Sequence, residues 1–226
     1  MTKSSVYSPE PAHRFLSLIF VATVLLLTFA SGCVRRGVKS EGTQDGYILS
    51  LLWWPAYCQN HRELHACAGA SFRGFVAQGL LPRASSTSQR ADCGVRPGPG
   101  DPSKVLDQIP DLALVQEVWR QYGLCSSLTA DNYFALVKDA LSLIHIPNRF
   151  IDPKDSFVIG PERIKEAFVK INAGLIEEDI KIVCNQANLS EVQICVSKDL
   201  HFMSCPASPA CQRSVVYVTA RMPLAE

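Results

Sequence analysis

The chain is 226 residues long, a length that predicts one domain or two small ones. Its 47% hydrophobic and 19% charged residues are ordinary for a globular protein with a buried core. Lysine and arginine number 22 and aspartate and glutamate 21. The chain therefore lacks the strongly basic balance of proteins that attract polyanions through a general electrostatic field.

The N-terminal segment is typical of a secretory signal. Lys3 and Arg14 precede an apolar run, residues 15–30, which is followed by two small residues and then Cys33. A cysteine in this position is typical of a bacterial lipobox, in which it becomes the lipidated first residue. One alternative is ordinary cleavage after Gly32, which would leave Cys33 as a free thiol on a secreted soluble protein. The other is a retained membrane span, for which this run is shorter than the ~20 residues that cross a bilayer.

We therefore predict three parts: a lipoprotein signal peptide at residues 1–32, an anchor and polar tether at 33–45, and one domain at 46–226. Cleavage before Cys33 removes two basic residues and one acidic residue from the totals, which leaves 20 of each sign. The expected location is the bacterial cell envelope, with the protein anchored by lipid and facing the periplasm or the cell surface.

Nine cysteines indicate disulfides and hence an oxidising compartment. None of them forms the C-x-x-C pair of a zinc knuckle, and the nearest spacings, such as Cys58 to Cys67, are too open. We therefore predict no metal and no cofactor. If Cys33 carries lipid, the remaining cysteines are eight, an even number that allows complete pairing.

The first half of the domain is predicted to contain strands and a long loop. The apolar run 47–54 stops at Pro55 and predicts a buried strand. A second strand is predicted at 72–77. Residues 84–103 are rich in serine, proline and glycine, which predicts a loop.

Three helices and a final group of strands are predicted to follow. The first helix ends near Gly123, the second is capped by Thr129 and stops at Pro147, and the third opens at Gly160 and ends at Gly174. Their inward residues, in order, are Leu112, Val115, Trp119 and Tyr122; Phe134, Val137, Leu141 and Ile144; and Ile164, Phe168 and Ile171. Strands are predicted at 180–185, 191–197 and 214–220, so the pattern predicts an α+β domain.

Several segments resemble the ribonuclease T2 family in order and spacing. LSLLWWPAYC (49–58) followed by FRGFVAQGLLP (72–82) is similar to the family's opening, in which W-x-P-x-x-C precedes the first catalytic motif, H-G-L-W-P. LVQEVWRQYGLC (114–125) is similar to the second motif, H-E-W-x-K-H-G-T-C. Segments around residues 130–175 and 183–205 resemble the family's later helices and its C-terminal disulfide region. The resemblance covers about residues 46–220.

The resemblance implies a fold and a disulfide pairing. The implied fold is a ribonuclease T2-like α+β domain, in which several helices accompany an antiparallel sheet. Sequence alone cannot choose among the pairings of eight cysteines. The family pattern implies four bridges: Cys58–Cys67, Cys93–Cys125, Cys184–Cys211 and Cys195–Cys205.

The family's chemistry, transesterification of RNA to a 2′,3′-cyclic phosphate, requires groups that this chain has replaced. One imidazole removes the 2′-hydroxyl proton, another protonates the leaving oxygen, and a glutamate, a lysine and a further histidine stabilise the charged phosphorane. The first motif's histidine is Gln78 here and its tryptophan is Leu81. In the second motif the first histidine, the glutamate, the lysine and the second histidine are replaced, in order, by Glu117, Val118, Gln121 and Tyr122. The motif residues that remain are Gly79, Leu80, Pro82, Trp119, Gly123 and Cys125.

No catalytic group of the family is therefore intact, and we predict an inactive homologue. A glutamine does not exchange protons near neutral pH, and an ordinary tyrosine, with a pKa near 10, is a poor acid. Each lost acid or base typically costs 10²–10⁴-fold in rate. The alternative is a weak or altered RNA-binding endoribonuclease that uses Glu117 as a base with a displaced histidine. The histidines of the mature chain are His61, His65, His145 and His201.

The altered site is predicted to act as a binding surface for a protein or a small apolar-aromatic ligand, with RNA possible but not favoured. Replacing a lysine and a histidine removes cations that would hold a phosphate, and Glu117 adds a negative charge. A purely structural role in the envelope is the remaining alternative. Two tryptophans, 53 and 54, either stack a ligand or pack in the core. The candidate binding residues are Trp53, Trp54, Leu81, Glu117, Val118, Tyr122 and Leu124.

Overall fold

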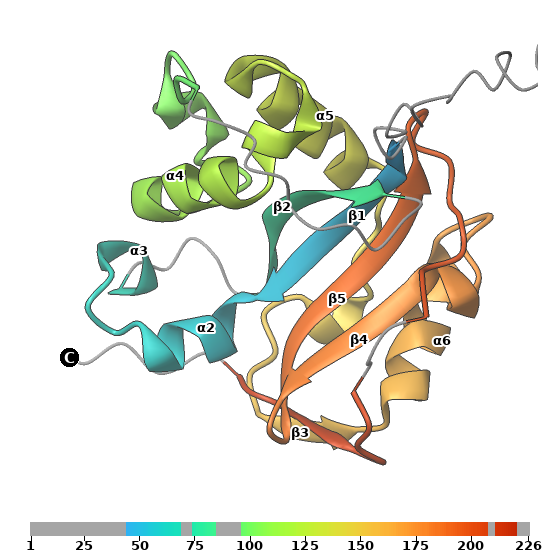
Figure 1. Ribbon diagram of the computed structural model, residues 1–226. Helices are drawn as coiled ribbons and strands as arrows, with labels where there is room; N and C mark the ends of the chain where they lie inside the picture. Colours follow the sequence, from blue (N-terminus) through green and yellow to red (C-terminus); the bar gives the residue numbers. More distant parts are fainter. Residues whose placement is uncertain (1–43, 69–73, 85–95, 208–210, 221–226) are drawn as a thin grey trace, which may run out of the picture. The chain divides into compact units, whose positions relative to one another are not determined.

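The computed structural model describes residues 44–68, 74–84, 96–207 and 211–220. The predicted signal peptide, Cys33 and most of the tether lie outside these residues, as does Cys93. Figure 1 shows a central sheet with helices beside it. In the described part of the chain, no helix is long and apolar enough to span a membrane.

Six strands form one sheet in the order β2-β1-β5-β6-β3, and β4 also pairs with β5. Neighbouring strands are antiparallel, except that β5 and β6 meet in parallel at a single pair of residues, Asn188 and Tyr217. The strands are β1 (Gln44–Trp53), β2 (Phe75–Ala84), β3 (Phe157–Ile159), β4 (Ile180–Asn185), β5 (Asn188–Ser197) and β6 (Val216–Val218).

The helices α4 and α5 contact β2, and α6 contacts β4 (Figure 1). The predicted cap of α5 is confirmed, because the Thr129 hydroxyl accepts a hydrogen bond from the Asn132 N–H at 3.3 Å. The α-helices are α2 (Trp54–Asn60), α3 (His65–Ala68), α4 (Leu112–Gln121), α5 (Ala130–Ser142) and α6 (Pro161–Ile171), and the 3₁₀ segments are η1 (Pro102–Val105), η2 (Gly123–Ser126), η3 (Asn148–Phe150) and η4 (Glu177–Asp179). The predicted α+β class, with a largely antiparallel sheet and several helices, is confirmed.

The structure differs from the prediction in several elements. Pro55 does not simply end the first strand, because it occupies the first turn of α2, where its missing N–H costs nothing. The short elements α3 and β3 were also not predicted. Leu112 and Ile171, predicted to face inward, are 50% and 41% exposed. Leu112 is the first residue of α4 and Ile171 the last residue of α6.

The core is built on one face of β1. Leu49, Leu51 and Trp53 alternate along the strand and have no exposed surface. The Trp53 ring packs edge-on against Phe75, at 4.8 Å between centroids, and Phe75 in turn packs against Phe168 of α6 at 5.9 Å. The same alternation turns Ser50 toward the opposite face, where its hydroxyl lies 2.9 Å from Gln78 Oε1.

Three of the four implied disulfides are present: Cys58–Cys67, Cys184–Cys211 and Cys195–Cys205. Cys125 is also disulfide-bonded. Its implied partner, Cys93, lies outside the described residues, so the fourth pairing stays a prediction.

Candidate functional site

The five positions that correspond to the charge-handling residues of the resemblance are called the motif site here. They are Gln78 on β2 and Glu117, Val118, Gln121 and Tyr122 on or directly after α4. The structure brings these two segments together at Gly79. A Cβ atom placed on Gly79 would lie 2.8 Å from Val118 Cγ1 and 3.4 Å from the Tyr122 ring.

Gly79 is retained for reasons of backbone geometry. Its φ of +139° is accessible to glycine and strained for other residues. The pairing of β1 with β2 shifts by one residue here, since Ser50 pairs with Gly79 and Leu51 with Ala77. Gln78 is the extra residue of this β-bulge, and bulges commonly re-aim a side chain. The bulge therefore sets the direction of the side chain that stands at the first histidine position.

The Gln78 side chain is tied to a polar network on the sheet. The buried Ser50 hydroxyl lies 2.9 Å from Gln78 Oε1 and 2.7 Å from Glu191 Oε2, and Gln193 Nε2 donates to the same Glu191 oxygen at 3.0 Å. A hydroxyl has one proton, so Ser50 cannot donate fully to both acceptors. Rotating the Gln78 amide by half a turn resolves this, because its NH₂ then donates to Ser50 while Ser50 donates to Glu191.

Glu191 also faces a cation across the sheet. Lys181 on β4 pairs with Gln193, and burial lowers the pKa of Lys181 while the charge of Glu191 opposes that change. Hydrogen bonds therefore join three neighbouring strands, from Gln78 on β2 through Ser50 on β1 to Glu191 on β5, and the charge of Glu191 acts on Lys181 of β4. This network holds the motif-site amide by hydrogen bonds and supplies no imidazole.

The α4 side of the motif site carries one carboxylate, one amide, one aliphatic side chain and one phenol. Val118, at the family's glutamate position, is 1% exposed and packs in the core. Gln121 Nε2 donates to Glu117 Oε1 at 2.6 Å, one helical turn away. Tyr122 is partly buried. Glu117 is therefore the one carboxylate among the five side chains of the motif site.

The retained motif residues Trp119 and Gly123 form a packing unit. A Cβ atom on Gly123 would collide with the Trp119 ring, so glycine is required for this approach. The Trp119 indole N–H donates to the Arg96 carbonyl at 3.3 Å, and the Arg96 guanidinium lies 5.7 Å from the centre of the ring. These residues maintain the fold beside the altered site.

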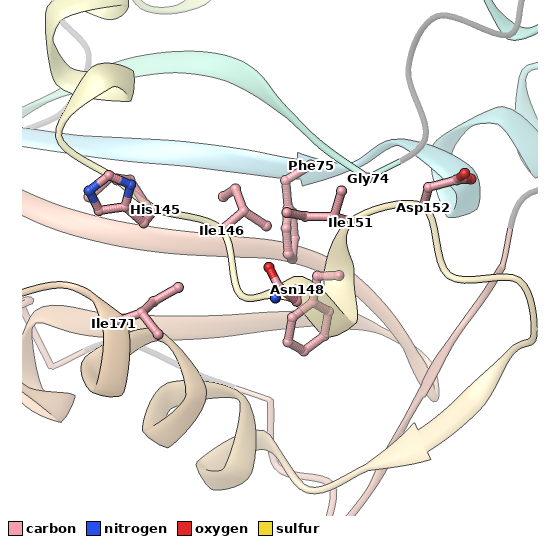
Figure 2. Close-up of a pocket in the computed structure, with 10 residues that line it drawn as sticks. Gly74, Phe75, His145, Ile146, Asn148, Ile151, Asp152 and Ile171 are labelled. Carbon is pink, nitrogen blue, oxygen red and sulfur yellow. The ribbon is translucent and has the colours of Figure 1, made fainter.

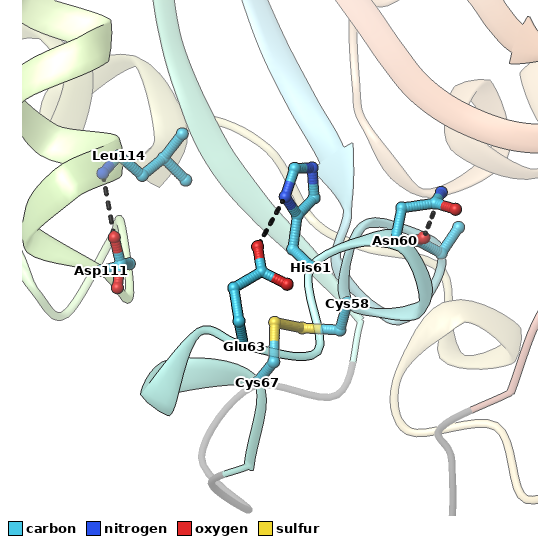
Figure 3. Close-up of polar contacts among 8 residues, drawn as sticks. Cys58, Asn60, His61, Glu63, Cys67, Asp111 and Leu114 are labelled. Atoms are coloured by element: carbon cyan, nitrogen blue, oxygen red, sulfur yellow. Dashed lines mark hydrogen bonds and ion pairs between the residues drawn. A yellow bond between two sulfur atoms is a disulfide. The ribbon is translucent and has the colours of Figure 1, made fainter.

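A series of stacked rings lies on α2. Trp54 stacks on Tyr57 at 5.2 Å between centroids, and Tyr57 stacks on His61 at 4.1 Å. His61 Nδ1 lies 3.4 Å from Glu63 Oε1 (Figure 3). Burial raises the pKa of Tyr57, and the negative charges of Glu117, Asp111 and Glu63 raise it further. The rings on α2 are therefore within electrostatic reach of Glu117 in the motif site.

Part of the predicted binding surface requires correction. Trp53 has no exposed surface, and its indole N–H donates to the Thr219 carbonyl at 2.9 Å. Trp54 is 2% exposed and Val118 1% exposed, so neither presents a surface to a ligand. The remaining predicted residues, Leu81, Glu117, Tyr122 and Leu124, are partly exposed. Trp53 is the last residue of β1 and lies on its core face. Trp54 is the first residue of α2 and is buried there.

Of the four histidines, His61 is the one that stacks on Tyr57. Its side chain is 42% exposed and is oriented by Glu63. His65, in the same disulfide loop, is exposed, as are His145 and His201. The Asn172 side chain accepts a hydrogen bond from the His145 backbone N–H at 2.7 Å and donates one to the His145 carbonyl at 2.9 Å.

Sequence reasoning missed Ser50, Tyr57, Glu63, Asp111 and Glu191. The spacing of Trp54, Tyr57 and His61 fits one face of a helix and could have indicated α2. The interpretation of Pro55 as the end of a strand left this helix unpredicted. Ser50 and Glu191 gave no local signal, because strand pairing joins them across 141 positions.

Two cavities in the described part of the chain lie away from the motif site. The larger, about 720 Å³, is lined by the segment 144–152, which includes η3, by Gly74 and Phe75 at the start of β2, and by Ile171 of α6 (Figure 2). The smaller, about 400 Å³, lies between η1 and α5. None of the five motif positions lines either cavity. Among the described residues, no group of three or more histidine, cysteine, aspartate or glutamate side chains is placed to hold a metal ion.

Comparisons with known proteins identify the family and the fold. The model of the ribonuclease T2 family matches residues 44–205. A probable ribonuclease of Haemophilus influenzae is 24% identical over 189 residues, which cover 75% of this chain and 64% of that protein. The chain thus spans less than two thirds of that relative.

Solved structures share the fold at low sequence identity. The RNase-related protein from Calystegia sepium superposes with a TM-score of 0.62 at 18% identity, covering 79% of this chain and 98% of that chain. Trichomaglin, an S-like ribonuclease, gives a TM-score of 0.62 at 18% identity over 78% of this chain and 97% of its own. RNase NT in complex with 5′-AMP gives 0.58 at 20% identity over 78% and 98%.

Proposed function

Since the chain belongs to the ribonuclease T2 family, we propose that it keeps the family's fold but no longer carries out RNA cleavage. It acts instead as a binding module, held in the bacterial envelope by a lipid on Cys33. Its ligand is a protein or a small apolar-aromatic molecule that contacts the motif site. The observation that carries this proposal is the motif site itself, in which amide, aliphatic and phenol groups occupy four of the five charge-handling positions.

The environment of each replacement supports the loss of proton transfer. Gln78 is hydrogen-bonded to Ser50, and Val118 is buried against Gly79. Glu117 remains as a possible base, but the site supplies no matching acid to protonate a leaving oxygen. Without that acid, the family's reaction loses the step that typically contributes 10²–10⁴-fold.

The charges near the motif site oppose a polyanion. Burial is the first cause of the raised pKa of Tyr57, and the negative charges of Glu117, Asp111 and Glu63 raise it further, so three carboxylates contribute negative charge at this surface. A nucleic acid would have to bring its phosphates into that potential. A protein or an uncharged aromatic ligand would not.

Titration with RNA tests this part of the proposal. A fluorescent single-stranded oligouridylate is added to the protein at about 50 and 200 mM salt, the range over which phosphate contacts weaken strongly. We expect no saturable binding at either salt concentration. Glu117→Ala is expected to increase any residual association, because it removes a negative charge. Tight, strongly salt-dependent binding that Glu117→Ala barely alters would restore a nucleic-acid role.

The lipid anchor is tested separately. Labelled fatty acid is expected to enter the wild-type protein in bacteria and to be lost in Cys33→Ser, which should also release the protein from membranes. A Ser variant that keeps the label or remains in the membrane fraction would contradict the anchor. The alternative is a secreted soluble protein, for which neither the wild type nor Cys33→Ser would incorporate the labelled fatty acid.

A weak or altered endoribonuclease is the second candidate, favoured by the His61–Glu63 pair. An imidazole whose Nδ1 is held by a carboxylate is a common arrangement for proton transfer. This candidate predicts slow RNA turnover that both His61→Ala and Glu117→Gln abolish. A purely structural envelope role would instead show neither turnover nor a saturable ligand.

A further inference from the structure

The face of α2 that carries Trp54, Tyr57 and His61 forms a stacked platform whose outermost ring is accessible. The centroid distances are 5.2 and 4.1 Å, and the interplanar angles are 19° and 25°. Trp54 is 2% exposed, whereas 42% of the His61 side chain is exposed. Within the described residues the stack ends at His61. Trp54 therefore forms the buried end of the stack, and the His61 ring is the part that a ligand can reach.

This platform is held rigidly. The Cys58–Cys67 disulfide joins α2 to α3 across nine positions. The His61 N–H donates to the Cys58 carbonyl at 3.3 Å, and the Leu64 N–H donates to the His61 carbonyl at 3.1 Å. Because the loop is already ordered, a ligand that stacks here loses little binding energy to immobilising it.

Three carboxylates accompany the platform. Glu63 lies 3.4 Å from the His61 ring nitrogen and is 70% exposed (Figure 3). Glu117 and Asp111, on and before α4, act on Tyr57 electrostatically. Glu117 and Asp111 each use one carboxylate oxygen in a hydrogen bond. Glu117 Oε1 accepts from Gln121 Nε2, and Asp111 Oδ1 accepts from the Leu114 N–H at 3.0 Å. In the described part of the chain, their second oxygens have no hydrogen-bond or ion-pair partner.

We propose that this platform binds the guanidinium group of an arginine on a partner protein. The planar cation stacks on the exposed His61 ring and its N–H groups face the Glu63 carboxylate, while Glu117 and Asp111 add negative charge to the same surface. The proposal rests on the proposed function, because it names the partner chemistry for the same site.

Arginine fits these features better than the other candidates. Its planar guanidinium stacks on aromatic faces and donates in pairs to carboxylates, whereas a lysine ammonium is a point charge with strong hydration. A nucleotide base could also stack on His61, but its phosphate would meet the three carboxylates. A neutral aromatic ring would stack without using them.

Three short peptides separate these contributions. Acetyl-Gly-Arg-Gly-amide is titrated into the full mature protein, followed by the lysine peptide and the citrulline peptide, and the ring signals of His61 and Tyr57 are followed by NMR. The citrulline side chain has the shape of arginine without its charge. We expect the arginine peptide to shift these signals and to bind roughly two- to fivefold more tightly than either analogue, as for an exposed pair between a guanidinium and a carboxylate.

Matched variants locate the contact. His61→Ala is expected to lower affinity for the arginine peptide by roughly two- to fivefold, whereas His65→Ala, in the same disulfide loop, should leave it unchanged. Glu117→Gln should weaken binding in the same way, whereas Asp139→Asn, which removes an exposed carboxylate on α5, should not.

Several outcomes would overturn the proposal. These are an absence of ring shifts with the arginine peptide, equal binding of the citrulline peptide, or equal losses in His65→Ala and His61→Ala. Tighter binding of 5′-AMP to the same rings would also overturn it and favour RNA. The oligouridylate titration separates a failure of the arginine proposal from a failure of the proposed function. If neither RNA nor the arginine peptide binds, only the arginine proposal is wrong.

Discussion

Replacement of Trp53 by alanine is expected to lower the free energy of unfolding by about 3–5 kcal/mol. The indole has no exposed surface and contacts Phe75 and Phe150 edge-on, at 4.8 and 6.1 Å between centroids. Its N–H donates to the buried Thr219 backbone at 2.9 Å. Alanine would leave a large cavity and an unsatisfied carbonyl, and both effects destabilise the fold.

Urea unfolding of the oxidised protein measures this loss. Leu112→Ala is the control, because Leu112 is 50% exposed and its truncation should change stability by less than about 0.5 kcal/mol. If Trp53→Ala unfolds like the control and instead loses a ligand of the motif site, the original interpretation of Trp53 as a binding residue would be correct.

The sequence predicted the fold best where periodicity and caps agree. The second predicted helix had apolar residues at helical spacing, a threonine cap and a proline stop, and α5 follows this pattern closely. The strand at 180–185 was predicted with its final bounds. The start of α2 was misread because a proline both ends strands and begins helices, and single-residue patterns cannot distinguish these roles.

The motif positions were predictable from the family resemblance, but their surroundings were not. Glu191 reaches Ser50 only because the β1–β5 register pairs Ser50 with Gln193 and Leu52 with Glu191. A register shifted by one residue would turn these side chains to the other face. The sequence alone does not specify that register. The same limit explains why Val118 was expected on a surface and is buried against Gly79.

The second large effect concerns catalysis. RNA turnover is expected to be lower than that of an active family member by at least about 10⁴-fold, since both imidazoles of the acid–base pair are replaced and each typically contributes 10²–10⁴-fold. Gln78 and Tyr122 stand where groups with a pKa near the working pH are needed. Restoring Gln78→His, Glu117→His, Val118→Glu, Gln121→Lys and Tyr122→His together is expected to recover only part of the activity, because Val118 lies in a buried position that does not readily accept a carboxylate.

A quenched-oligonucleotide cleavage assay of the purified protein from pH 4 to pH 8 tests the central claim most directly. The loss of the acid–base pair predicts no rise in fluorescence above the buffer control at any pH, with an active ribonuclease T2 protein as the positive control. A robust signal that co-purifies with the protein and disappears in Glu117→Gln would contradict this account and establish an active site built around that carboxylate.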